Sequence, residues 1–259
     1  PNAPTVHNRV PWHRGSATFS GNNFDSAQLP GWDVAVGELT DNDIQGSTVN
    51  LTGMTDAVGV SVFRRNIIRQ ASAVTIVSDQ LTMLQNTILN SVVDCQSGSQ
   101  FGCFNNRFTT GSSIIINAAT TGHVAVNGSD MHTSYRLRVN GFTGGSPGSN
   151  CLINDNQMSG KGTGIDDMVC SGTGAIAVTE NQISDSTLMF SGSGATQVLD
   201  NTLSEMTVTQ DAASTAPMTI QESEFRGSSI TVGPANTGST NLFDQCDVLS
   251  SSFTFNGPT

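Results

Sequence analysis

Residues 178–190 read VTENQISDSTLMF, and residues 198–208, twenty positions later, read VLDNTLSEMTV. In both segments an apolar residue stands five positions before a second apolar residue, and Asn stands two positions before that second residue. A polar turn and then alternating apolar residues follow. With that second apolar residue as the reference, the pattern comes eleven times at intervals of 20 to 27 residues. The reference positions are Phe24, Ile44, Ile68, Ile88, Phe108, Met131, Met158, Ile183, Leu203, Phe225 and Val248. A repeat of this length indicates stacked supersecondary units rather than one globular core.

Two further apolar columns define the strands of each repeat. The position five residues before the reference is never polar: Phe19, Leu39, Phe63, Met83, Cys103, Val126, Ile153, Val178, Val198, Ile220 and Phe243. An apolar pair in period-two alternation follows the reference in most repeats, as in Val49 and Leu51 or Ile230 and Val232. The sequence therefore predicts an all-β fold, a parallel β-helix of about eleven coils with three short strands per coil, as a single domain over residues 17–259.

The position two residues before the reference is Asn in eight repeats. These residues are Asn22, Asn42, Asn66, Asn86, Asn106, Asn156, Asn181 and Asn201. Asn tolerates the left-handed backbone conformation that a sharp corner needs, and its amide can bond the equivalent amide on the next coil. We expect these residues to turn the chain and to form a structural ladder.

The Asn-x-apolar corner and the three-strand repeat across residues 17–256 resemble the pectin-lyase-like superfamily of right-handed, single-stranded parallel β-helices. That superfamily includes polysaccharide lyases and hydrolases, phage tail spikes and bacterial surface adhesins. The resemblance implies a right-handed solenoid, and it implies no single activity because this architecture carries unrelated functions.

Composition restricts the partners of the chain. It holds 10 basic and 21 acidic residues, a net charge of −11, so we expect no binding to nucleic acid. No run of eighteen apolar residues occurs, so we expect no membrane insertion. Residues 1–16 precede the first repeat and are predicted to be an N-terminal arm or cap, with pairing to a neighbouring subunit as the alternative. The uneven spacing of the repeats predicts that a single corner carries the long loops, at Gly141–Asn150 and Gly160–Gly164.

The five cysteines leave two interpretations open. Bridges between Cys95 and Cys103 and between Cys151 and Cys170 would suit an extracellular protein. The alternative is that these cysteines are small buried hydrophobic residues. Cys246 stands at an Asn position of the ladder and is predicted to be a free thiol.

Stacked acidic residues are the strongest signal for chemistry. Three positions before the reference, successive repeats carry Asp155, Glu180, Asp200 and Glu222, with Asp41 further back. Asp185 and Glu205 form a second pair, two positions after the reference. Carboxylates stacked at about 5 Å allow three interpretations. We favour a solvated acidic stripe; a bound structural Ca²⁺ is the second. The third is a pair of catalytic carboxylates as in glycosidases, for which the candidates are Glu180, Asp200, Asp185 and Glu205. No other cofactor is expected.

The remaining polar and aromatic residues form only partial sites. Asp166 and Asp167 resemble the paired aspartates of polygalacturonases, but the other elements of that motif are missing. His132 is predicted to be a surface residue, and Tyr135 is predicted to protrude. No set of His or Cys has metal-ligand spacing.

These observations favour a non-catalytic structural or attachment protein on the outside of a cell or a virion, such as a subunit of a surface filament, an adhesin, or a phage tail spike or fibre. Its expected partner is itself, by end-to-end stacking or as a homotrimer, with surface or extracellular polysaccharide as a second partner. The alternatives are a polysaccharide-degrading enzyme that uses the stacked carboxylates, and a carbohydrate-binding rod without turnover.

Overall fold

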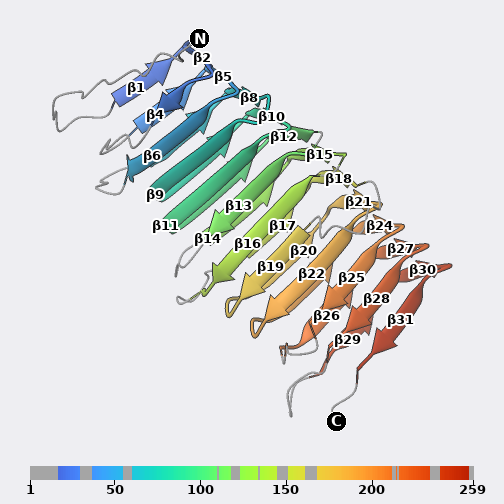
Figure 1. The fold of residues 1–259 in the computed structure, drawn as a ribbon. Coiled ribbons are helices and arrows are strands. Elements are labelled where there is room, and N and C mark those ends of the chain that lie inside the picture. The colour runs from blue at the N-terminus through green and yellow to red at the C-terminus, as the bar shows by residue number, and fades with distance from the viewer. Residues whose placement is uncertain are drawn as a thin grey trace.

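The computed structural model describes residues 17–29, 37–54, 60–109, 111–117, 123–133, 135–144, 151–160, 168–211, 214, 216–233 and 240–256. In this part of the chain the fold is an all-β parallel solenoid without helices, as predicted. Figure 1 shows the coils stacked along one axis from the N-terminal to the C-terminal end. The predicted arm at residues 1–16 lies outside the described residues.

The strands form three walls. The first wall consists of β1 (Ala17–Ser20), β4 (Gly37–Thr40), β7 (Ser61–Arg64), β9 (Ala73–Leu84), β11 (Val92–Phe104), β14 (His123–Asn127), β17 (Cys151–Asn154), β20 (Ile176–Thr179), β23 (Thr196–Leu199), β26 (Met218–Gln221) and β29 (Leu242–Asp244). The second wall is an 11-stranded sheet of β2 (Asn23–Asp25), β5 (Asp43–Gln45), β8 (Ile67–Arg69), β10 (Thr87–Leu89), β12 (Arg107–Thr109), β15 (Asp130–His132), β18 (Gln157–Ser159), β21 (Gln182–Ser184), β24 (Thr202–Ser204), β27 (Glu224–Arg226) and β30 (Asp247–Leu249). The third wall consists of β3 (Gln28–Leu29), β6 (Thr48–Met54), β9, β11, β13 (Ser113–Asn117), β16 (Arg136–Phe142), β19 (Met168–Gly172), β22 (Thr187–Gly192), β25 (Thr207–Gln210), β28 (Ser229–Val232) and β31 (Ser252–Phe255).

The strands β9 and β11 belong to two walls at once. Each pairs with strands of the third wall through its first half and with strands of the first wall through its second half, which joins the two walls into one 20-stranded sheet. No residue within Ala73–Leu84 or Val92–Phe104 has a positive φ that would break the strand. The prediction of three separate strands is therefore wrong for these two strands, because the chain bends here within one strand, with only a shift of register between Ser97 and Gln100.

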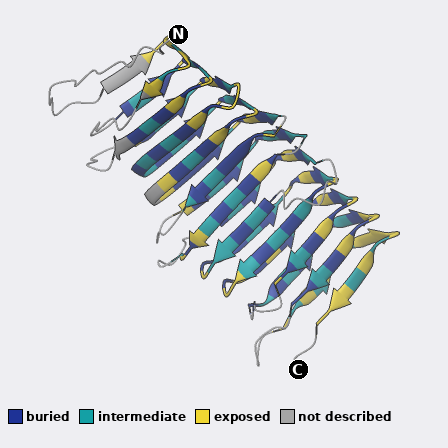
Figure 2. Cartoon of the chain, in the orientation of Figure 1, coloured by how far each residue is buried: buried dark blue, intermediate teal, exposed yellow. Residues whose placement is uncertain are grey.

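The predicted apolar columns are stacked in register. Ile183 pairs with Leu203, and Leu203 pairs with Phe225, along the second wall. From Ile44 to Phe225 the reference side chains are at most 2% exposed. They meet the columns of the other two walls in one continuous core, which Figure 2 shows as buried stripes along the stack. Burial of one such side chain contributes roughly 1.5–3 kcal/mol, so the core is the main source of stability.

The asparagine ladder is present. The Nδ2 of one Asn donates to the Oδ1 of the next, at 3.0 Å from Asn42 to Asn66 and 3.0 Å from Asn181 to Asn201. From Asn42 onward each Oδ1 also accepts the backbone N–H of the preceding ladder residue, as in Asn156 N to Asn181 Oδ1 at 3.0 Å. Ser129 continues the ladder where Asn is missing, because its hydroxyl accepts from Asn106 N at 3.2 Å.

The ladder asparagines do not turn the chain, which corrects our expectation. None of them has a positive φ; the left-handed residue is the one before each of them, such as Glu180 with φ 56° and Asp200 with φ 54°. The side chain of Asn must point inward to reach the next coil, so the preceding residue makes the corner.

A second ladder was not predicted. Serines just before the third wall bond from coil to coil, as in Ser47 N to Ser72 Oγ and Ser72 N to Ser91 Oγ, both at 3.2 Å. Tyr135 occupies the equivalent position, is 1% exposed and places its hydroxyl 3.1 Å from Ser186 Oγ. The prediction that Tyr135 protrudes is wrong, because its ring fills the interior at this corner.

The long loops do not share one corner. Residues 145–150 fall between β16 of the third wall and β17 of the first, whereas residues 161–167 fall between β18 of the second wall and β19 of the third. The expectation of a single loop-bearing edge is therefore wrong.

Candidate functional site

The acidic columns lie at the two corners that flank the second wall. Along the first corner, Asp155, Glu180, Asp200 and Glu222 follow one another with φ between 50° and 56°. The backbone N–H of each donates to a carbonyl of the next coil, for example Glu180 N to Leu199 O at 3.1 Å. All four side chains are exposed. They form a stripe of stacked carboxylates facing water.

The second pair, Asp185 and Glu205, lies at the opposite corner, with φ 50° and 52°. Both side chains are exposed. The Glu205 carboxylate lies over Gly227, since a Cβ added there would be 2.5 Å from Glu205 Oε1. Gly227 belongs to the coil after Glu205, and Asp185 belongs to the coil before it. The Glu205 carboxylate is therefore directed away from the Asp185 coil.

Asp41, the early member of the acidic column, is neutralised by a cation from its own column. Arg65 donates to its carboxylate through two nitrogens, at 2.6 Å and 2.7 Å. These hydrogen bonds from Arg65 lower the pKa of Asp41. The acidic stripe therefore begins only in the C-terminal half of the solenoid.

The acidic residues assemble no metal site in the described part of the chain. No group of three or more His, Cys, Asp and Glu side chains there converges closely enough to hold a metal ion. The structure stacks four of the acidic residues in one column but does not gather them around a common centre. These residues are Asp155, Glu180, Asp200 and Glu222. Asp166 and Asp167 lie outside the described residues.

We expect Glu180→Asn to raise the free energy of unfolding by about 0.5–1 kcal/mol. Asn adopts a positive φ more readily than Glu, and the substitution removes one of several like charges in the column. Chemical denaturation of the two proteins measures the change. Asp200→Asn is the matched control, since it removes a charge at the equivalent corner while starting from a side chain better suited to positive φ. A loss of stability in Glu180→Asn would show that this carboxylate has a partner that the corner geometry does not reveal.

A contact between Asp, His and Ser side chains on the second wall was missed by sequence analysis. His132 Nδ1 lies 2.6 Å from Ser159 Oγ, and His132 Nε2 contacts Asp130 Oδ1. Asp130 and His132 are two residues apart on β15, and Ser159 stands beside His132 on β18. The register of neighbouring coils brings these side chains together. The repeat pattern could not predict this contact, because it is defined by the inward-facing positions.

This trio lacks one part of an acyl-transfer centre. Such a centre needs N–H donors beside the serine for the oxyanion. The N–H that follows Ser159 belongs to Gly160, and it donates to Ser184 O at 2.9 Å. This N–H is thus engaged in coil-to-coil pairing, and in the described residues the trio is a polar contact between neighbouring coils.

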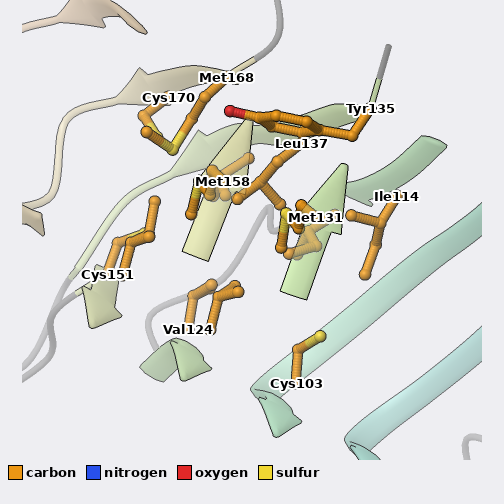
Figure 3. Close-up of a cluster of buried hydrophobic side chains, with 14 of the residues drawn as sticks. Cys103, Ile114, Val124, Met131, Tyr135, Leu137, Cys151, Met158, Met168 and Cys170 are labelled. Carbon is orange, nitrogen blue, oxygen red and sulfur yellow. The ribbon is translucent and has the colours of Figure 1, made fainter. Parts of the chain in front are cut away.

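All five cysteines are free thiols in this structure. Cys95, Cys103, Cys151 and Cys170 are fully buried, and Cys246 is intermediate. The first two lie on one continuous strand, β11, with Cys95 in the third wall and Cys103 in the first. Figure 3 shows Cys103, Cys151 and Cys170 among the apolar side chains of the core. The alternative interpretation, small buried hydrophobic residues, fits them.

We expect the native protein to be alkylated only at Cys246 at neutral pH. Burial raises the pKa of Cys103 and Cys170 to about 12 and that of Cys95 and Cys151 well above 9, and only the thiolate reacts. Intact mass spectrometry should show one adduct on the folded protein and five adducts after unfolding without reductant. Three or fewer adducts on the unfolded protein would restore the disulfide interpretation.

Comparison with protein-family models, with curated proteins and with solved structures finds no match. In the described residues, no helix has the length and apolar character to cross a membrane.

Proposed function

We propose that this chain is a non-catalytic structural or attachment protein of the cell or virion exterior, a β-helical subunit of a surface filament, an adhesin or a tail spike. The observation that supports this best is the contrast between core and surface. The apolar columns continue through the described solenoid, whereas its acidic corner side chains are exposed and, in the described residues, converge on no common centre. Selection for a long, regular rod explains both. Membership of the pectin-lyase-like superfamily, with its right-handed winding, is part of this proposal.

Polysaccharide is the natural second partner of such a rod. The outer surface of the second wall carries short polar side chains in register, including Gln157 beside Gln182 and Ser159 beside Ser184. Amides and hydroxyls of this kind can hydrogen bond to sugar hydroxyls. A rod that binds polysaccharide without cleaving it is therefore consistent with the proposed attachment role.

The test separates structural, binding and catalytic roles. Purified protein is incubated with acidic and neutral polysaccharides, and new reducing ends and unsaturated products are measured; we expect neither. Binding on a glycan array without product formation would favour the attachment version. Product formation that Glu180→Gln and Asp200→Asn abolish would replace this proposal by a polysaccharide-degrading enzyme.

A further inference from the structure

Three sulfur atoms lie close together inside the solenoid where β9 and β11 pair. Cys95 and Cys103 belong to β11 and Met83 belongs to β9, and all three side chains are 0% exposed. The thiol of Cys95 donates to the thioether of Met83, with Sγ and Sδ 3.6 Å apart. Cys103 is the register partner of Met83 on the next coil. We call these two thiols and one thioether the sulfur cluster.

Cys103 belongs to the cluster by position and by electrostatics. Paired strands are about 4.8 Å apart, so the backbone of Cys103 lies directly over that of Met83. Burial raises the pKa of Cys95 well above its usual range, and the charge of Cys103 raises it further. That second effect requires the two thiols to be near each other. The thioether of Met83 therefore has one thiol in contact with it and another beside it.

The asparagine ladder supplies an N–H donor to the sulfur cluster. Asn86 Nδ2 donates to Asn106 Oδ1 at 2.9 Å, but the ladder residue after Asn106 is Ser129, which has no amide oxygen. Asn106 Nδ2 instead donates to Cys103 Sγ at 3.2 Å, beside its bonds to two backbone carbonyls. An N–H directed at sulfur stabilises negative charge there, and such outer contacts are usual around the ligands of a metal ion.

The ligand types and their spacing suit a soft metal ion. Thiolate and thioether sulfurs select Cu(I) among the metals that proteins bind. Two sulfurs that each lie about 2.3 Å from one metal ion, at a tetrahedral angle, are about 3.8 Å apart. The separation of Cys95 Sγ and Met83 Sδ, 3.6 Å, is close to that value. An ion between them would take the place of the thiol hydrogen that now joins the two atoms.

The apolar surroundings favour a monovalent ion. The cluster lies in the continuous core, where an uncompensated charge is costly. Both thiols are protonated at neutral pH, because burial raises the pKa of Cys95 well above its usual range and that of Cys103 to about 12. One Cu(I) that displaces one thiol proton leaves the net charge of the core unchanged. A divalent ion keeps the core neutral only if it displaces two.

We infer that the sulfur cluster binds one Cu(I) ion, with Cys95, Cys103 and Met83 as its ligands. A Cu–S bond forms as one thiol S–H bond breaks, and the proton is released to water, so binding weakens as the pH falls. No electron is transferred in this step. Because all three side chains are fully buried, the ion enters only when neighbouring coils separate, and loading is slow. The site lies inside the rod and is independent of the proposed attachment role.

Metal loading of the full chain tests the stoichiometry. The background is Cys246→Ser, which removes the one thiol that is not fully buried. The probes are Cu(I) under anaerobic conditions and Ag(I), which has the same charge and the same preference for sulfur. Native mass spectrometry should show one ion per folded chain with either probe. The melting temperature should rise, because a ligand that binds only the folded state stabilises it.

Substitutions in the same background identify the ligands, with affinity measured by competition against a chelator. Met83→Leu should weaken binding roughly tenfold or more, because it removes the thioether and keeps an apolar side chain of similar volume. Cys95→Ala and Cys103→Ala should each weaken it further. Met218→Leu is the matched control, since Met218 is 1% exposed on the first wall. Cys151→Ala is a second control, which removes a fully buried thiol of another coil. We expect both controls to bind as the background does.

X-ray absorption at the copper edge needs no substitution in the cluster, so it decides even where a cysteine variant does not fold. Sulfur neighbours at about 2.3 Å are expected, and a shell of nitrogen or oxygen neighbours would overturn the inference. Equal affinity of Met83→Leu and Met218→Leu would do the same. A melting temperature that falls when the ion is added would also contradict the site, because the ion would then bind the thiols of the unfolded chain.

Discussion

Asn181→Ala is expected to lower the free energy of unfolding by about 4 kcal/mol. Asn181 is 1% exposed, and its side chain takes part in five hydrogen bonds. Its Oδ1 accepts from Asn156 N and Nδ2, and its own Nδ2 donates to Ile153 O, Thr179 O and Asn201 Oδ1. Alanine leaves several of these buried groups without a partner, and each unpaired group costs about 1–3 kcal/mol. Denaturant unfolding measures the loss.

Asn181→Ser is the matched control for this substitution. Serine already occupies the ladder at Ser129 and Ser223, where its hydroxyl accepts the N–H of the neighbouring coil. We expect Asn181→Ser to lose about half as much stability as Asn181→Ala, because one acceptor is kept. Equal stability of the alanine variant and the wild type would mean that the ladder does not stabilise the solenoid.

Gly192→Ala is expected to destabilise the protein by more than about 3 kcal/mol or to prevent folding. Gly192 has a φ of 136°, a conformation that residues with a Cβ rarely adopt, and it lies directly on Gly172 of the previous coil. A Cβ there would lie 1.9 Å from Gly172 O. Strain in the backbone alone costs of order 1–3 kcal/mol, and the clash with a backbone atom adds to it because the coils cannot separate locally. Thermal unfolding measures the loss.

Gly21→Ala separates the two contributions. Gly21 has a φ of 69°, but an added Cβ there has no heavy atom within 4 Å. We expect a loss of about 1 kcal/mol from conformational strain alone. A similar small loss for Gly192→Ala would show that the third wall can widen at this point, contrary to the tight stacking described above.

The stacking of the inward-facing side chains could be predicted from the sequence, because burial restricts which residues can occupy these positions. Ile183, Leu203 and Phe225 must be apolar because they share one buried file, so the sequence records their stacking at every turn. The Asn ladder leaves a similar record. The corner conformation does not, because Asp, Glu, Gln, Arg and Gly all occupy the left-handed position. Asn was therefore wrongly predicted to make the turn.

Outward contacts and interior substitutions escaped prediction for a different reason. His132 and Ser159 meet because of coil register, and outward positions carry no repeating residue type that would reveal it. Tyr135 replaces a ladder serine, and nothing in its neighbours in sequence indicates that the interior has room for a ring. The acidic residues were correctly placed in columns, but a column does not specify the direction in which a carboxylate points, as Glu205 shows.

The two strands that continue from the third wall into the first, β9 and β11, have a consequence for how the chain folds. In a solenoid each coil gains stability only from its immediate neighbours, so order must begin at some pair of coils and spread from it. Two long strands paired across two walls lose less entropy per hydrogen bond than coils that must also form sharp turns. This pair, in the N-terminal half of the solenoid, is therefore suited to act as the nucleus from which coils are added in both directions.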